Sequence, residues 1–468
     1  MQPPEVEYIR DQIANHVAEF TTLESGDLFD SGLIRFLPYD EAATIQERAI
    51  AVPFDIPIPK SQEEPYKVRF NDTDLTLWNR ITPPSDNSWR AIPDGSAPLW
   101  YTNRFGSLIP AWNLFGNLFY LLTFGEEKES SQKDLHGRFA ASFSPRAKYG
   151  LLEIPAFNEA VAALVGACAG LRDSGQPAFN IDGLIGPPVI SLSHDCDILR
   201  GNDIWTQAVR LVRIFRPLVK MRLPGISNSW WIMRNAVAPR AFYFDNATGM
   251  IDLERCFGYR STFYMLNGRS GRFGARSGLA VIPELLKEIP PEWDIGVHYN
   301  YDTFLNDERF SAQMEQLQEV TDSDIVVGRA HYLRFDPEKS FSFLQKHGIS
   351  IDESSGYSDM IGYRNGIAGC FQVYDTVLKR PLEIWELPMT IMDTTLVRQY
   401  GPESITRFSQ LLYHLSRVGG ALSVSFHPGQ FFNPEHKQML GVYHRMLIEC
   451  RQTGALAKTA RSHVDSIA

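Results

Sequence analysis

Short apolar runs alternate with longer amphipathic segments throughout the second part of the chain. The apolar runs are residues 189–195, 259–266, 293–300, 325–333, 348–352, 382–393 and 421–429, and the amphipathic segments are 311–320, 338–348, 405–420 and 436–454. Strands that alternate with helices are typical of a parallel sheet, and about seven strands suffice to close a barrel. We therefore predict an α/β fold, a distorted (β/α)7-type barrel, for residues 186–468.

The first part of the chain is less regular. Proline-rich turns occupy residues 52–65 and 81–98, and the aromatic segment WNLFGNLFYLLTF at 112–124 suits a buried helix. The Gly/Pro sequence GLIGPP at 183–188 then interrupts the chain before the first apolar run. We predict a separate, uncharacterised α+β N-terminal module over residues 1–185.

Composition and charge narrow the class of protein. Hydrophobic residues make up 44% and charged residues 21% of the 468 positions, as in folded globular proteins, and the formal net charge is −10. An acidic chain does not favour nucleic-acid binding, since contacts to phosphates need clustered Lys and Arg. The basic stretch 210–222 is interpreted as a solvated helix face, and the glycine-rich sequence GRSGRFGARSG at 268–278 as a flexible loop rather than a phosphate loop.

The cysteines and the N-terminal residues indicate the cellular compartment to expect. The five cysteines are Cys168, Cys196, Cys256, Cys370 and Cys450. They are odd in number and widely spaced, which favours neither a disulfide framework nor a zinc knuckle. The first residues lack a signal-peptide pattern, and no apolar segment is long enough to span a bilayer. We expect a cytoplasmic protein; the sequence does not determine its oligomeric state.

Polar residues fall where the predicted strands end. Asp195 and Asp197 stand at the end of the first run, His298 near the end of the third, Arg329 and His331 within the fourth, and His427 near the end of the last. In a barrel the carboxyl ends of the strands open onto one face, where enzymes of this architecture place their sites. We expect these side chains to converge.

Two short sequences are compatible with a metal site. In SHDCD, Asp195 and Asp197 would repel each other unless a cation lies beside them, although a simple strand-ending turn is the alternative. In GVHYNYDTF, His298 and Asp302 are four apart, a spacing that suits chelation on one helical turn but is also common on surfaces. One His and two carboxylates would hold zinc, or else Mn, Co, Ni or Fe.

Arg329 and His427 are candidates for supporting chemistry. A guanidinium buried in IVVGRAHYL needs a carboxylate, and Asp195 is the natural partner, unless Arg329 extends to the rim. His427 in SFHPG ends a strand at a sharp turn and could donate protons near neutral pH, or be a structural histidine.

These motifs, in this order, resemble those of the polysaccharide deacetylases, the family four carbohydrate esterases with nodulation-type chitooligosaccharide deacetylase homology. The resemblance implies a catalytic base at Asp195 and a metal ligand at Asp197. It implies further ligands at His298 and Asp302, and a proton-donating acid at His427.

The remaining motifs match less completely. Arg329 corresponds to an Arg that orients the base, while His331 stands where that family has Pro, and the oxyanion-binding amide is expected near Tyr332. For the supporting fourth motif, SSGYSDMIGYRNGIAG offers Asp359 and Arg364, with Asp393 as a weaker candidate.

The resemblance extends upstream of the predicted barrel. Residues 134–161 resemble an uncharacterised module that precedes the barrel in a divergent bacterial branch of the family, and His136 within them is interpreted as structural.

Together the motifs predict a metal-dependent hydrolase that removes an N-acetyl (or O-acetyl) group from a carbohydrate. Two alternatives stay open: a metal-dependent amidohydrolase acting on a non-sugar amide, and a non-catalytic carbohydrate-binding homologue.

Overall fold

A computed structural model describes most of the chain. The described residues are 2–23, 25–29, 32–58, 64–83, 88–199, 243–267, 273, 279–430 and 438–467. The basic stretch 210–222 lies outside them, as does the glycine-rich sequence 268–278 apart from Phe273.

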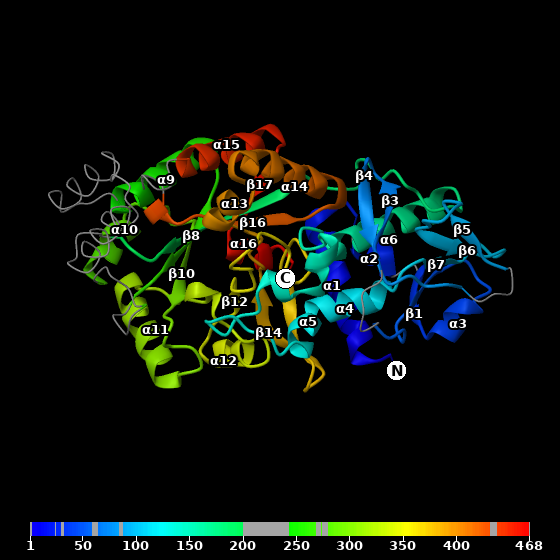
Figure 1. Ribbon diagram of the computed structural model, residues 1–468, viewed down its shortest axis with the longest axis horizontal. Helices are drawn as coiled ribbons and strands as arrows, with labels where there is room; N and C mark the ends of the chain where they lie inside the picture. Colours follow the sequence, from blue (N-terminus) through cyan, green and yellow to red (C-terminus); the bar gives the residue numbers. More distant parts are fainter. Residues whose placement is uncertain are drawn as a thin grey trace, which may run out of the picture.

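A large, mostly parallel sheet forms the framework of the second half (Figure 1). Its strands are β8 (Val189–Cys196), β9 (Ser261–Met265), β10 (Asp294–Tyr299), β11 (Val327–Ala330), β12 (Ile351–Asp352), β13 (Phe371–Asp375), β14 (Arg380–Glu386), β15 (Ile391–Met392), β16 (Ala421–Ser425) and β17 (Leu456–Ala457). They follow the order β13-β14-β12-β11-β10-β9-β8-β16-β15, with β17 beside β8. Only the β13–β14 pair is antiparallel among these described strands.

The strand predictions are confirmed with one correction. The predicted strand 382–393 is divided into β14 and β15 by residues 387–390, because Pro388 has no N–H to continue a ladder. Within the described residues no strand pair joins the edge strands β13 and β15, so the sheet curls into a half-barrel that is open between them. The closed (β/α)7 barrel remains a prediction.

Helices cover the outer face of this sheet, and they include the four that the sequence predicts. They are α9 (Tyr243–Phe257), α10 (Ile282–Leu286), α11 (Asp307–Thr321), α12 (Ser340–Lys346), α13 (Asp393–Tyr400), α14 (Ser404–Val418) and α15 (Met439–Gln452). The short helix α16 (Ala460–Asp465) instead packs on the inner face, where Ala460 contacts the cluster that contains Tyr264 and Val327. Helix α14 shows why they pack: Phe408, Leu411, Leu412 and Leu415 recur at helical spacing and are all buried. In Figure 1, α13 to α15 lie in the upper part of the view and α11 and α12 in the lower part.

The N-terminal half contains helices around a smaller sheet. Its helices are α1 (Pro4–Phe20), α2 (Ser25–Phe29), α3 (Tyr39–Ala43), α4 (Leu114–Leu122), α5 (Gly125–Glu129) and α6 (Ala156–Asp173). The sheet has the order β1-β2-β7-β6-β5 (Ile34–Leu37, Ile50–Pro53, Leu108–Pro110, Trp100–Thr102, Arg90–Ile92), and β3 (Tyr66–Phe70) pairs separately with β4 (Thr73–Leu77). The predicted buried helix at 112–124 is α4, capped by the Asn113 side chain.

Buried ion pairs join the two halves. Arg146 is fully buried and pairs with Glu126 at 2.9 Å, and it also donates to the backbone carbonyl of Arg364 at 2.7 Å. The Arg364 guanidinium in turn pairs with Glu127. The N-terminal half therefore holds the segment 353–370 that follows β12. The boundary near residue 185 stays a prediction.

None of the helices in the described part of the chain combines the length and apolar character that a membrane crossing requires.

Replacing Arg146 tests how strongly this junction contributes to stability. Arg146→Ala leaves the Glu126 carboxylate buried without its partner, and we expect the free energy of unfolding in urea to fall by about 3–5 kcal/mol. Arg35→Ala is the matched control, since Arg35 pairs with Glu47 but both side chains are about half exposed. Its expected cost is below ~1 kcal/mol. Equal losses for the two variants would contradict the assignment.

Candidate metal centre and active site

A buried guanidinium organises the strand ends. Arg329 on β11 uses all five of its N–H groups. Its Nη1 donates to Asp195 Oδ1 at 2.7 Å and to Ser425 Oγ at 3.1 Å. Its Nη2 donates to Ser193 Oγ at 2.7 Å and to the Glu353 carboxylate, and Nε donates to the Glu353 carbonyl at 3.2 Å. A charge buried in this way is paired and fully hydrogen-bonded.

The side-chain alternation of β8 explains why the partners meet. Successive strand residues point to opposite faces, so Ser193 and Asp195 share the face that Arg329 reaches from β11, with β9 and β10 lying between. The guanidinium also lies over the Tyr264 ring, 4.3 Å from its centroid. The pairing of Arg329 with Asp195 that the sequence predicts is present.

Electrostatics keep Asp195 ionised. Burial by itself raises the pKa of this carboxyl group, but Arg329, His298 and His427 outweigh burial and hold the pKa below its ordinary value. Because Arg329 occupies Oδ1, the other oxygen, Oδ2, faces the two histidines.

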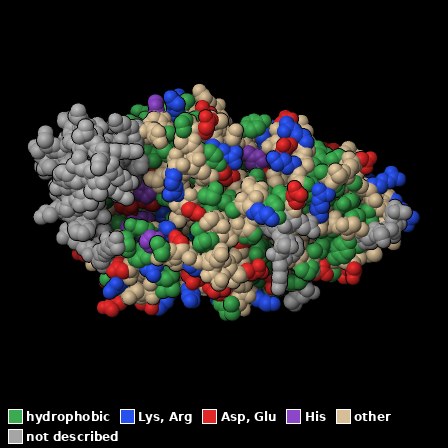
Figure 2. Space-filling model, in the orientation of Figure 1, with side chains coloured by type: hydrophobic (Ala, Val, Ile, Leu, Met, Phe, Trp, Pro, Cys, Tyr) green, Lys and Arg blue, Asp and Glu red, His purple; other side chains and the backbone are tan. Residues whose placement is uncertain are grey.

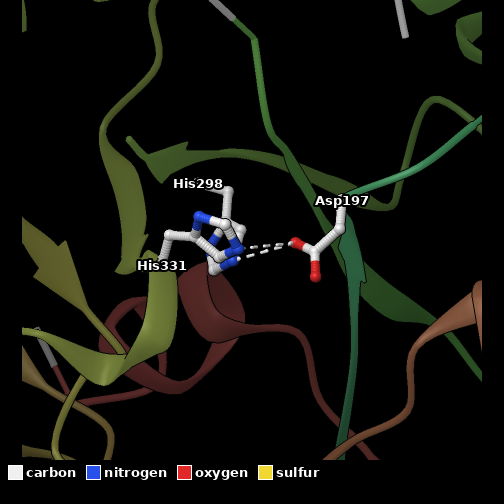
Figure 3. Close-up of side chains that lie close together, drawn as sticks. All are labelled: Asp197, His298 and His331. Atoms are coloured by element: carbon white, nitrogen blue, oxygen red, sulfur yellow. Dashed lines mark ion pairs between the residues drawn. The ribbon is translucent and has the colours of Figure 1, made fainter. Parts of the chain in front are cut away.

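Three side chains beside this ion pair form a candidate metal site (Figure 3). Asp197 follows β8, His298 lies on β10, and His331 follows β11 in a short 3₁₀ turn. Asp197 Oδ1 lies 3.3 Å from His298 Nε2 and 3.7 Å from His331 Nε2. Ligands bound at about 2.1 Å in a tetrahedron are separated by about 3.4 Å, so the spacing fits one divalent ion.

Hydrogen bonding shows what these atoms can bind. His298 Nδ1 lies 3.0 Å from the Arg329 carbonyl oxygen, which can only accept, so Nδ1 carries a proton, and in the neutral ring Nε2 presents a lone pair. That lone pair faces the Asp197 carboxylate, a contact between two acceptors that a cation would relieve. A metal-binding His usually donates its second nitrogen to a carbonyl in this manner.

His331 has the charge state that a ligand needs. Burial lowers its pKa to about 4 in spite of the neighbouring carboxylate of Asp197, so the imidazole is neutral at pH 7. The His331 ring is 5.0 Å from that of His298, and its side chain is mostly buried.

Asp302 does not lie in this cluster. The strand β10 ends at Tyr299 and a turn follows, while helix α11 begins only at Asp307, so the four-residue spacing from His298 does not span a helical turn. The Asp302 carboxylate accepts a hydrogen bond from Arg309 at 2.9 Å. The structure brings His331 to Asp197 and His298 instead.

His427 and Asp393 form a further hydrogen-bonded pair at the carboxyl ends of the strands. His427 follows β16, and its backbone N–H and Nδ1 both donate to the buried carboxylate of Asp393, at 2.9 and 3.2 Å. Its Nε2 lies 3.6 Å from Asp195 Oδ2. Burial lowers the pKa of His427, but Asp393 and Asp195 raise it to about 10, so the imidazole is protonated at neutral pH.

Two candidates for a supporting role lie elsewhere. The Asp359 carboxylate accepts the backbone N–H of Ala141 at 2.9 Å, and Arg364 pairs with Glu127 at the junction of the halves. The carboxylates that contact His427 and Arg329 belong to Asp393, the weaker sequence candidate, and to Glu353, which was not predicted from the sequence. Both directly follow a short strand, β15 and β12, which is the signal that could have identified Glu353.

Tyr332 forms the outer edge of the site. It is 38% exposed and left-handed, with φ 64° and ψ 11°, which is uncommon for a residue with a side chain. Its ring lies 4.7 Å from the His331 ring. Figure 2 shows histidine and acidic side chains together in a recess left of centre on this face.

Comparisons with known proteins match the two halves separately. Residues 2–169 match a model described as a family of unknown function (DUF7033), which covers less than half of the chain and ends before β8. No curated protein matches.

Several of the solved structures that match are assigned as deacetylases. One, from Mycobacterium smegmatis, is assigned as a polysaccharide deacetylase; it has 14% identity and a TM-score of 0.39, over 59% of this chain and 88% of that one. Another, from Pseudomonas aeruginosa, has 12% identity and a TM-score of 0.38, over 60% and 89%. The chitin deacetylase of the fungus Colletotrichum lindemuthianum has 14% identity and a TM-score of 0.31, over 58% and 85%. Likenesses this loose do not establish a function.

Metal titration distinguishes the two possible ligand sets. We expect His331→Ala to weaken zinc binding, measured by calorimetry, on the order of 100-fold or more, since loss of a direct ligand should exceed the effect of an outer residue. Asp302→Ala should change the affinity by less than about threefold, because Asp302 pairs with Arg309. The reverse ranking would restore the ligand set expected from the sequence.

Proposed function

We propose that this chain is a metal-dependent deacetylase that removes an N-acetyl (or O-acetyl) group from a carbohydrate. The observation that carries the proposal is the position of Asp195 Oδ2. It lies 3.6 Å from His427 Nε2 and 4.0 Å from His298 Nε2, between a protonated histidine and the candidate metal ligands.

The metal site complements this pair. A divalent ion held by Asp197, His298 and His331 would supply Lewis-acid polarisation of the acyl oxygen and a lowered pKa for water. Zinc is the ion that two imidazoles and one carboxylate suit best, and Mn, Co, Ni or Fe fit the same ligands less selectively.

Asp195 is the proposed general base. Arg329 holds Oδ1 at 2.7 Å, so the carboxylate has a fixed orientation and stays ionised. The free oxygen, Oδ2, accepts the proton of the attacking water as the carbon–oxygen bond forms.

His427 is the proposed general acid. Asp393 fixes the ring through Nδ1 and keeps it protonated, which leaves the Nε2 proton for the leaving group. As the acyl carbon–nitrogen bond breaks, this proton passes to the departing amine, and acetate and a free amine result.

The proposed oxyanion donor is a backbone amide at Tyr332, beside His331. A left-handed backbone at this residue turns the peptide sharply at the edge of the recess. The reaction class thus rests on the side chains and the turn, whereas the choice of a carbohydrate rests on the motif resemblance.

Asp195→Asn tests the base. The amide keeps the shape of the side chain but cannot take a proton, so we expect acetate release from an N-acetylated chitooligosaccharide to fall about 10²–10⁴-fold. Zinc binding should persist, because Asp195 is not one of the three ligands. The exposed Asp307→Asn is the control. Undiminished acetate release would remove Asp195 from the mechanism.

The leaving group tests the acid. His427→Ala should slow hydrolysis of the N-acetyl substrate by about 10²-fold or more, because an amine departs only with a proton. The rate with 4-nitrophenyl acetate should change much less, since nitrophenolate leaves without one. Asp393→Asn should show the same pattern more weakly. Equal losses on both substrates would mean that His427 has another role.

A further inference from the structure

A tight hairpin of the N-terminal half reaches the metal site. The Asp134 carboxylate accepts the backbone N–H groups of His136 and Arg138 at 2.8 and 2.9 Å, and the Asp134 N–H donates to the Arg138 carbonyl at 2.9 Å. Gly137 has φ +78°, a left-handed conformation that favours glycine at this turn. Residues 134–138, the 134–138 hairpin, are therefore fixed by their own hydrogen bonds.

The hairpin holds the turn after β11. Arg138 Nη1 donates to the Tyr332 carbonyl at 2.6 Å, while Nε donates to Asp134 Oδ2 at 2.8 Å. The guanidinium thus links a rigid hairpin to a left-handed residue that follows directly after the metal-site His331. This hydrogen bond constrains the orientation of the peptide group that follows Tyr332.

His136, at the tip of the hairpin, adds its ring to a row of aromatic side chains at the site. The His136 ring lies 5.0 Å from that of Tyr332 and 5.7 Å from that of Tyr301, and Nδ1 is 3.1 Å from the Tyr301 hydroxyl. From His298 through His331 and Tyr332 to His136, neighbouring rings are at most 5.0 Å apart. The N-terminal half is thus continuous with the metal site, and the neighbouring Leu135 is fully exposed.

We propose that the 134–138 hairpin is one wall of the substrate site, in which Arg138 is a positioning residue for the Tyr332 turn and His136 contacts the sugar beyond the acetylated one. This inference rests on the proposed function. Partly exposed rings beside polar groups suit a pyranose, whose apolar face packs on rings while its hydroxyls find hydrogen-bond partners. The site is then incomplete without the N-terminal half.

Arg138 variants test the positioning role. For Arg138→Ala we expect kcat for chitotetraose to fall about 10–100-fold with zinc affinity almost unchanged. The reason is that a displaced Tyr332 turn no longer holds the proposed oxyanion donor in place. Arg138→Lys should recover part of the rate, since one donor remains. Arg407→Ala is the matched control. Like Arg138, Arg407 joins the two halves, in its case through an ion pair with Glu153 at 2.6 Å. Its kcat should stay within about twofold of wild type.

His136→Ala tests the sugar contact. KM should rise about 10-fold for chitotetraose and stay within about twofold for a single N-acetylglucosamine, because the proposed contact lies beyond the acetylated residue. The same change in KM for both substrates would overturn this part.

A crystal structure of Arg138→Ala separates the two proposals. We expect the Tyr332 φ to leave the left-handed region. If Tyr332 keeps that conformation and kcat matches the Arg407→Ala control, the positioning role is wrong. If the wild-type protein releases no acetate, the proposed function fails, and the conformation of Tyr332 in the variant still decides the role of Arg138.

Discussion

The site depends on a single buried guanidinium. Arg329 lies within a parallel sheet where an unpaired charge would cost several kcal/mol, and it is retained because β8, β16 and the segment after β12 each contribute an acceptor. The same residue accepts through its carbonyl from His298 Nδ1. One residue therefore orients both the proposed base and a proposed metal ligand, which couples their positions.

Strand ends bring the remaining groups to this centre. Asp197, His331 and His427 each follow a strand within two residues, so the sheet fixes their backbones and short turns aim their side chains. The Asp393 carboxylate accepts two hydrogen bonds from His427 and keeps that imidazole protonated, as a general acid must be. Burial lowers the pKa of both His427 and His331. The charge and hydrogen bond of Asp393, together with Asp195, outweigh burial at His427, whereas Asp197 does not outweigh it at His331.

Much of this arrangement could be predicted from the sequence, and the failures have physical causes. The apolar runs predicted the parallel strands, and the acids and histidines after them predicted the convergence of Asp195, Asp197, His298 and His427. Asp302 was expected beside His298 because a helical turn was assumed, but a non-helical turn follows β10. His331 was expected at the same convergence but not as a ligand, because the motif resemblance gave the third ligand position to Asp302.

Contacts between the N-terminal half and the large sheet were not predicted from the sequence. The Arg138 link to Tyr332 spans 194 positions, and the Arg146 link to Arg364 spans 218. No periodicity marks either pair. His136 was interpreted as structural from its motif, and only its three-dimensional neighbours suggest a role at the site.

Anomalous diffraction at the zinc edge tests the central claim most directly. Crystals grown with zinc should show one strong peak within bonding distance, about 2.0–2.2 Å, of Asp197, His298 and His331, with Arg329 still bound to Asp195. A peak coordinated by Asp302 in place of His331, or the absence of any peak beside Asp197, would contradict the account.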